Sequence, residues 1–283
     1  MESQQPTASV QVSPTTQAPP DATKRSDAET LAAIQATIDN ARKMRPPIET
    51  AKPLVAPALP PPKSEAQIAA EEAERERRVA ERRQWERGQR WSELVASRGS
   101  RYADARLTNY AVYDQRQQAA TDRVREFCDD MPSRSHDGCG LVLFGPSGTG
   151  KDHLMMAALR AAVVKWDFKP LWINGMELFG ELRDAIGGDR DESQVLRRFM
   201  SADILAISDP LPPFGSLTEY QASMLFRIID GRYANQRPTW ATVNVVNGEE
   251  AKTRMGAQIQ DRLRHGAVTV HCNWPSFRER GAK

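Results

Sequence analysis

This sequence of 283 residues contains few cysteines, no long apolar run and little net charge. Its three cysteines, Cys128, Cys139 and Cys272, lie far apart without a Cys-x-x-Cys pair, which argues against a zinc ribbon and a disulfide scaffold. No apolar run approaches the roughly 20 residues of a membrane span, and the N-terminus lacks a signal-peptide pattern. A net charge of +2 argues against a strongly basic nucleic-acid coat but permits local basic faces. We therefore expect a cytoplasmic protein with no membrane partner.

Residues 1–63 contain no aromatic residue and are rich in Pro, Ala, Thr, Gln and Ser. Such a segment cannot bury enough apolar area to offset the entropy of ordering, so we predict a disordered tail. One island interrupts it, because the capping-box pattern Ser26-Asp-Ala-Glu29 precedes apolar residues at helical spacing and predicts a short helix over 26–44. That helix is either transient and solvated or folds into the groove of a partner.

Residues 64–98 are dense in Glu and Arg, and the pattern Ser64-Glu-Ala-Gln67 marks a helix start. Opposite charges three and four residues apart support a helix, whereas the apolar residues are too sparse for a coiled-coil seam. We predict a charged helical arm. It is either simply solvated, or it binds a protein partner or nucleic-acid phosphates, and Trp85 and Trp91 would mark a docking site if they are exposed.

A glycine-rich loop follows the apolar run Leu141–Phe144 and ends at Lys151. Its pattern, Gly-x-x-x-x-Gly-Lys, is that of a loop whose backbone N–H groups surround nucleotide phosphates at the start of a helix. Glycine allows the positive φ angles and close approach that such a loop needs. Asp152 stands where this motif has a Ser or Thr that binds Mg²⁺. The expected nucleotide-binding residues are Gly145, Pro146, Ser147, Gly148, Thr149, Gly150, Lys151, Asp152 and His153.

Apolar strand patterns alternate with helical patterns from about residue 101 onward, which we assign to one folded domain over 99–283. This alternation predicts an α/β fold, a parallel sheet with helices on both faces and hence three layers. The expected strands are 141–144, 169–174, 204–207, 238–245 and 267–271, and the main expected helices are 115–130, 154–164, 176–186, 218–235 and 248–265.

Polar residues follow three of these strands, where an open α/β sheet binds its ligand. The first strand leads to Lys151, which would reach the β and γ phosphates. The strand 204–207 is followed by Ser208 and Asp209, and the strand 238–245 carries Asn244, placed to orient a water or sense the γ phosphate. Arg262, at the end of the last helix, could complete a neighbouring subunit's site as an arginine finger does.

The ordered set of motifs resembles the AAA+ ATPases of the helicase-loader type (DnaC/DnaI-like), with the IstB-like transposition helpers as relatives. The resemblance spans roughly residues 101–278. It is carried by Leu107-Thr-Asn-Tyr110, Gly148-Thr-Gly-Lys-x-His-Leu154, Asp209, Thr218-Glu-Tyr-Gln221, Leu225-Phe-Arg-Ile-Ile-Asp-x-Arg-Tyr233, Pro238-Thr-x-x-Thr-x-Asn244 and Asp261-Arg-Leu-Arg-His-Gly266.

This resemblance implies a P-loop NTPase without a C-terminal lid domain, and an enzyme that hydrolyses ATP. It implies that Asn109 and Tyr110 lie near the adenine and that Lys151 binds phosphate. Asp209 would be the Walker-B acid and Asn244 sensor 1.

Arginines near the end of the folded part would act between subunits of a homo-oligomer with shared ATP sites. The resemblance assigns the finger in trans to Arg262, with Arg264 and Arg254 as weaker candidates.

Two positions depart from this family pattern, because Asp152 replaces a hydroxyl residue and Ser208 replaces the first of two acids. We hypothesise that these Mg²⁺ ligands have exchanged places, so that Asp152 supplies the carboxylate and Ser208 the hydroxyl beside Asp209. Mg²⁺ prefers octahedral oxygen ligation and keeps several waters, which tolerates such an exchange. In the alternative, Asp152 repels the phosphates, and ATP is bound weakly or hydrolysed slowly.

The resemblance implies an ATP-dependent replication protein that acts on a replicative helicase and single-stranded DNA. The alternative is an IstB-like ATP-dependent helper of a DNA transposase, and a third reading is a nucleotide-binding scaffold without turnover. In the first two readings the N-terminal region would bind the protein partner.

Overall fold

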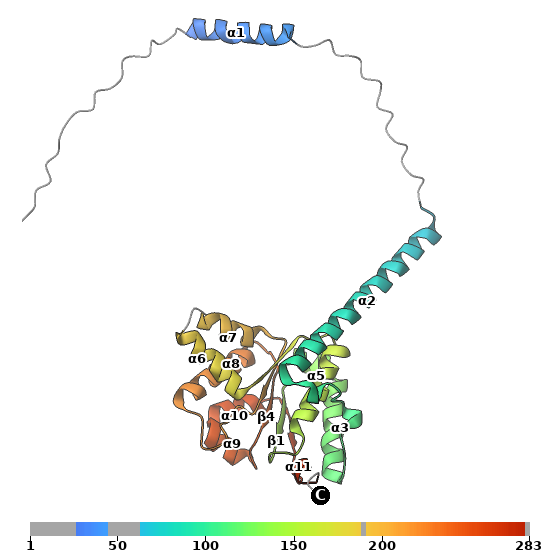
Figure 1. Ribbon diagram of the computed structural model, residues 1–283, viewed down its shortest axis with the longest axis vertical. Helices are drawn as coiled ribbons and strands as arrows, with labels where there is room; N and C mark the ends of the chain where they lie inside the picture. The colour runs from blue at the N-terminus through green and yellow to red at the C-terminus, as the bar shows by residue number, and fades with distance from the viewer. Residues whose placement is uncertain (1–26, 45–62, 188–190, 281–283) are drawn as a thin grey trace, which may run out of the picture. The chain divides into compact units, whose positions relative to one another are not determined.

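The computed structural model describes residues 27–44, 63–187 and 191–280 (Figure 1). The chain divides into two compact units, Met1–Lys63 and Ser64–Lys283. In the first unit, α1 (Asp27–Lys43) forms at the predicted place, and its apolar residues Leu31, Ile34 and Ile38 are exposed. The rest of the predicted tail, residues 1–26 and 45–62, lies outside the described residues. Within the described ranges, no helix combines the length and apolar character that a bilayer crossing requires.

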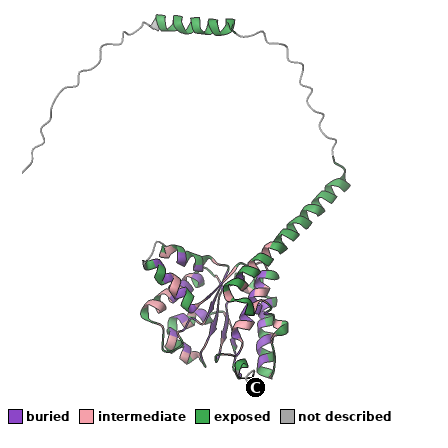
Figure 2. Cartoon of the chain, viewed as in Figure 1, coloured by how far each residue is buried: buried purple, intermediate pink, exposed green. Residues whose placement is uncertain are grey.

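The second unit begins with α2 (Glu65–Arg98), a continuous charged helix (Figure 1). Ser64 caps it as predicted, since its hydroxyl accepts a 3.3 Å hydrogen bond from the Gln67 N–H and the Gln67 side chain accepts one of 2.9 Å from the Ser64 N–H. Ion pairs between successive turns support the exposed part, for example Arg82 with Glu86 at 3.0 Å. This part of α2 is exposed along its length, as Figure 2 shows.

The last turns of α2 pack against the domain. Leu94 is buried, and Trp91 and Val95 lie against the same core. Arg87 and Arg90 both pair with Asp167, in the loop after α5 (Lys151–Val164). The sequence led us to expect folded structure from about residue 101, but the packed turns of α2 already begin near Arg87.

Five parallel strands form the central sheet in the order β2-β3-β4-β1-β5. This confirms the predicted α/β fold. The strands are β1 (Leu141–Phe144), β2 (Pro170–Asn174), β3 (Ile204–Ser208), β4 (Thr239–Val243) and β5 (Val268–His271). Residues of β1 and β3 are buried on both faces, as expected for a sheet covered by helices.

Two hydrophobic clusters, one on each face of the sheet, hold the layers together (Figure 1). The end of α2, α3 (Gln115–Asp129) and α5 contribute to the first cluster. The helices of the second are α6 (Gly175–Gly187), α7 (Glu192–Ser201), α8 (Glu219–Ala234), α9 (Gly248–Met255) and α10 (Ala257–Arg264). Short helical turns complete the described fold: 100–102, 107–109, α4 (Met131–His136) and α11 (Phe277–Arg280).

Two sequence expectations were wrong in detail. The single helix predicted over 248–265 is two helices, α9 and α10, because Gly256 breaks it with a φ of 96°. The strand predicted over 238–245 ends at Val243, so Asn244 begins a turn. Both differences shape the candidate site, since they set where Asn244 and the end of α9 lie.

Candidate nucleotide-binding site

The loop between β1 and α5 has positive φ angles, which strongly favour glycine, at three of its positions. Gly145, Gly148 and Gly150 have φ values of 148°, 82° and 88°. A Cβ atom on Gly145 would lie 2.3 Å from the Cys272 carbonyl oxygen, and one on Gly150 would lie 2.9 Å from the Tyr110 ring. The predicted phosphate loop therefore has the conformation that its glycines indicate.

A cavity of about 290 Å³ opens beside this loop and brings together most of the predicted site residues. It is lined by Ser147, Gly148, Thr149, Gly150, Lys151, Asp152, His153, Asn109, Tyr110, Asp209 and Asn244. Other residues line it that the sequence did not single out, among them Tyr102 and Arg278. Gly145 and Pro146, at the start of the loop, do not line this cavity; their carbonyl groups accept hydrogen bonds of 2.9 and 2.7 Å from the Lys151 ammonium.

One side of the cavity is formed by the segment before α3. The Tyr110 hydroxyl donates a 2.8 Å hydrogen bond to the Thr149 carbonyl, which joins this segment to the phosphate loop. His153 Nε2 lies 3.2 Å from Asn109 Oδ1 and 3.2 Å from the Arg106 carbonyl oxygen. His153 therefore orders the wall that carries Asn109 and Tyr110.

Lys151 is a buried cation at the first position of α5. Burial lowers the pKa of its ammonium group, while Cys272, Asp209 and Asp152 act in the opposite direction. Its hydrogen bonds to loop carbonyls aim the charge at the cavity. A phosphate group is the natural ligand of such a charge beside a helix N-terminus.

Asp152, Ser208 and Thr242 meet at the ends of α5, β3 and β4. The Ser208 hydroxyl donates a 3.0 Å hydrogen bond to Asp152 Oδ1, and the Thr242 hydroxyl donates one of 2.8 Å to the same atom. Ser208 and Thr242 are almost fully buried. The sequence predicted that Asp152 and Ser208 are neighbours, but Thr242 was missed because only the register of β3 with β4 places it opposite Ser208.

Asp209 follows β3 in a strained, left-handed conformation with a φ of 46°. Burial and the nearby Asp152 raise the pKa of its carboxyl group, while Lys151, the Asn244 side chain and Arg98 lower it. Among the described residues, buried Asp209 Oδ1 has no hydrogen-bond partner.

These oxygen donors fit a hard cation. One carboxylate, two hydroxyls and the orphaned oxygen of Asp209 leave room for the waters that Mg²⁺ usually keeps. Within the described ranges, no group of three or more His, Cys, Asp or Glu side chains could hold a metal ion by itself. A cation here would therefore depend on the hydroxyl groups, water and the nucleotide phosphates.

A second cavity of about 580 Å³ shares Asp152, Asp209 and Asn244 with the first and is also lined by Arg98 and Glu177. Arg98 is the last residue of α2 and only 12% of its side chain is exposed. Its guanidinium lies 4.8 Å from the centre of the Trp172 ring and 3.6 Å from Glu177 Oε2. The helical arm thus ends at a cavity that Asp209 also lines.

The predicted finger Arg262 lies outside both cavities. Its guanidinium donates a 2.9 Å hydrogen bond to Asp230 on α8 and lies over the Tyr233 ring.

Three comparisons place the chain among known proteins. A family model described as IstB-like ATP binding protein matches residues 67–283. A relative from Sinorhizobium fredii, described as an insertion sequence ATP-binding protein, is 31% identical over 151 residues, which are 51% of this chain and 48% of the relative. This chain therefore matches about half the length of that relative.

The DnaC structure shows that the fold is shared. A crystal structure of the DnaC helicase loader matches with a TM-score of 0.55 and 21% identity over 61% of this chain and 99% of that one. A crystal structure of DnaI matches with a TM-score of 0.48 and 21% identity over 61% of this chain and 90% of that one.

Proposed function

Since this chain belongs to the family of IstB-like ATP-binding proteins, we propose that it is an ATP-hydrolysing helper of a DNA transposase that acts on DNA as a homo-oligomer. The observation that carries the ATPase activity is the single cavity that gathers Lys151, Asp209 and Asn244 at the carboxyl ends of neighbouring strands. The insertion-sequence relative supports the transposase as partner.

The phosphate loop and Lys151 would bind the β and γ phosphates, and Asn109 and Tyr110 would border the adenine. Asp152, Ser208 and Thr242 would hold Mg²⁺, which when bound neutralises phosphate charge. This assignment develops the exchange hypothesis, with Thr242 as an additional hydroxyl.

The remaining site residues would act on the attacking water. Asp209 is a partly buried carboxylate with a raised pKa and a buried oxygen, Oδ1, that has no hydrogen-bond partner among the described residues. These properties suit a group that accepts a proton from water. Asn244 would orient the water or contact the γ phosphate. Arg262 would stabilise transferred charge in the site of the neighbouring subunit.

ATP turnover by the purified chain tests this proposal. We expect the wild type to hydrolyse ATP. Lys151→Ala should abolish both hydrolysis and nucleotide binding, and Asp209→Asn should reduce hydrolysis at least about 100-fold while ATP still binds. The matched control is Arg125→Met, a change of an exposed arginine on α3, which should alter neither ATP turnover nor nucleotide binding. Unchanged turnover in Asp209→Asn would contradict the assigned site.

A pull-down tests the partner. The exposed part of α2, Glu65–Glu86, carries Trp85 with 65% exposure and is the part of the arm available to a partner. Deleting residues 1–86 leaves Arg87 and Trp91 in their contacts with the domain and should preserve ATPase activity. We expect the full chain, but not the deletion, to retain a transposase encoded by the same mobile element.

A helicase loader is the second candidate. It is favoured by the likeness of fold to the DnaC helicase loader over 99% of that chain. Recovery of a hexameric replicative helicase in the same pull-down would support it over the transposase helper.

A further inference from the structure

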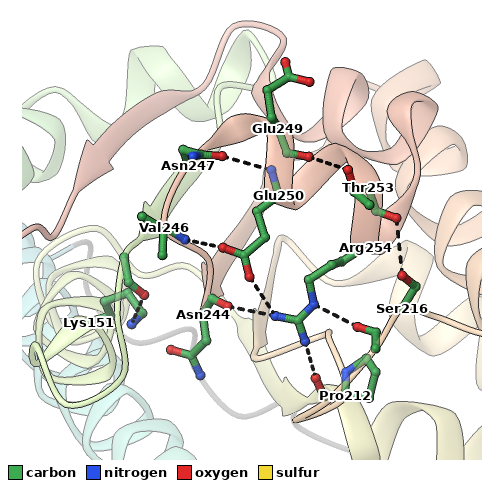
Figure 3. Close-up of polar contacts among 12 residues, drawn as sticks. Lys151, Pro212, Ser216, Asn244, Val246, Asn247, Glu249, Glu250, Thr253 and Arg254 are labelled. Carbon is green, nitrogen blue, oxygen red and sulfur yellow. Dashed lines mark hydrogen bonds and ion pairs between the residues drawn. The ribbon is translucent and has the colours of Figure 1, made fainter.

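Arg254, in the last turn of α9, joins three segments of the chain through one guanidinium group (Figure 3). Only 17% of its side chain is exposed. Figure 3 shows this group between the turn at Asn244 and the loop that contains Pro212. Each guanidinium nitrogen donates to at least one acceptor of the same chain.

On one side, Arg254 holds the turn that follows β4. Its Nη1 donates to the Asn244 carbonyl oxygen at 3.3 Å and to Glu250 Oε1 at 3.2 Å. The other oxygen of Glu250 accepts a 2.7 Å hydrogen bond from the Val246 N–H. Asn247 caps α9 by accepting a 2.9 Å bond from the Glu250 N–H. The main chain of Asn244 is therefore fixed by α9, while its side chain faces the cavity.

On the other side, Arg254 holds the loop between Asp209 and α8. Its Nε donates to the Gly215 carbonyl at 2.8 Å and its Nη2 to the Pro212 carbonyl at 2.6 Å. The Leu217 N–H donates a 2.9 Å bond to the Arg254 carbonyl. This loop starts at the strained Asp209 and carries Phe214, which is 91% exposed. Its conformation is thus tied at one end to the carboxylate that would act on water.

We propose that Arg254 is a positioning residue of the ATP site in its own subunit, and that it couples the Asn244 turn to the 209–217 loop. This inference rests on the proposed ATPase function. Three carbonyls and one carboxylate accept from a planar, forked donor, an arrangement that the point charge of a lysine cannot reproduce. A movement of Asn244 toward or away from a γ phosphate would shift the carbonyl that Arg254 holds, and with it the loop that carries Phe214.

This role differs from that of a finger in trans, for which the sequence also made Arg254 a weaker candidate. A finger must release its guanidinium to a neighbouring nucleotide. Arg254 lines the second cavity with its side chain only 17% exposed, and all three of its guanidinium nitrogens donate to acceptors of its own chain. Arg262 is 35% exposed, lies outside both cavities, and pairs with the partly exposed carboxylates of Asp230 and Asp261.

Steady-state kinetics of the full chain form the first test. We expect Arg254→Met to lower kcat about tenfold to 100-fold. KM for ATP and the affinity for ADP should stay within about threefold of the wild type, because misplacing a group that contacts the reacting atoms slows turnover more than it weakens binding. Arg254→Lys should fail to restore kcat. Arg125→Met is the control. Wild-type kcat in Arg254→Lys would overturn the proposal.

Mixing experiments separate action in cis from action in trans. A Lys151→Ala subunit has a dead site but intact arginines, so it should restore turnover to an Arg262→Met subunit if Arg262 is a finger. It should not restore turnover to Arg254→Met, whose own site is defective. Restoration in the second mixture would overturn the proposal and make Arg254 a finger.

Amide hydrogen exchange tests the coupling between the two segments without relying on ATP turnover. A wild type that does not hydrolyse ATP would contradict the proposed function but not this coupling. In the nucleotide-free protein, Arg254→Met should speed amide exchange in both 210–217 and 244–247, and Arg125→Met in neither. With a non-hydrolysable ATP analogue, the wild type should change exchange in both segments together. Exchange that changes in one segment alone would overturn the coupling.

Discussion

The Ser208 hydroxyl donates a 3.0 Å hydrogen bond to the Asp152 carboxylate, and this contact joins the end of β3 to the first turn of α5. The two residues that depart from the family pattern therefore lie in contact, and Thr242 donates to the same carboxylate oxygen. The two departures from the family pattern are one local feature rather than two separate changes.

If the pair acts as a unit, its two members cannot be changed independently. We expect Asp152→Thr and Ser208→Asp each to lower ATP turnover at least about tenfold. The first change leaves three hydroxyls without a carboxylate, and the second leaves two carboxylates together. The double variant should recover part of the loss. Turnover measured at saturating Mg²⁺ checks this. Multiplying losses in the double variant would contradict the exchange.

The charge of Arg98 should contribute to the acid limit of turnover. If Asp209 accepts a proton from water, it acts as a carboxylate, and turnover falls as the pH drops through its pKa. Burial and Asp152 raise that pKa, while Lys151, the Asn244 side chain and Arg98 lower it. Removing this charge with Arg98→Met should therefore move the acid limb of the kcat profile to higher pH, and Arg98→Lys should move it less. An unchanged limb would show that Arg98 does not act on Asp209.

The buried Arg232 should be needed for folding rather than for chemistry. Its guanidinium has no exposed surface and donates to the carbonyls of Phe199, Ala202 and Pro238, among others, at the edge of the sheet opposite the site. Arg232→Met removes these buried hydrogen bonds, although the Pro238 carbonyl keeps one from the Leu205 N–H and the Ala202 carbonyl one from Arg237. The loss should cost about 3 kcal/mol of unfolding free energy. Urea denaturation measures it. The exposed Arg227, changed to Met, should stay within about 0.5 kcal/mol of the wild type.

The two tryptophans of the arm should behave differently. Trp91 packs on the core beneath the Arg160 guanidinium, at 4.9 Å, whereas Trp85 is 65% exposed. Trp91→Ala should cost about 2 kcal/mol of stability, and Trp85→Ala should leave stability unchanged while weakening capture of the protein partner. Equal melting temperatures for both variants would contradict the packing of Trp91.

The sequence alone was enough for the order of strands and helices, the phosphate loop and the meeting of Asp152 with Ser208. These predictions succeed because glycine spacing, apolar runs and parallel connections are local properties, and parallel strands present their carboxyl ends at one edge. Thr242 and Arg254 were not assigned their places, because strand register and the break at Gly256 bring them there. Trp85 and Trp91 look alike in sequence, and only the docking of the last turns of α2 separates them.

The firm attachment of α2 also defines a distance. Because Trp91, Leu94 and Val95 anchor its base, the segment Glu65–Glu86 extends as a stiff rod of roughly 33 Å at 1.5 Å per residue. A partner that binds the far end of this helix is held at a fixed distance and in a fixed direction from the ATP site. The same helix ends at Arg98, which lines a cavity together with Asp209, so one continuous element joins the partner's attachment point to the site.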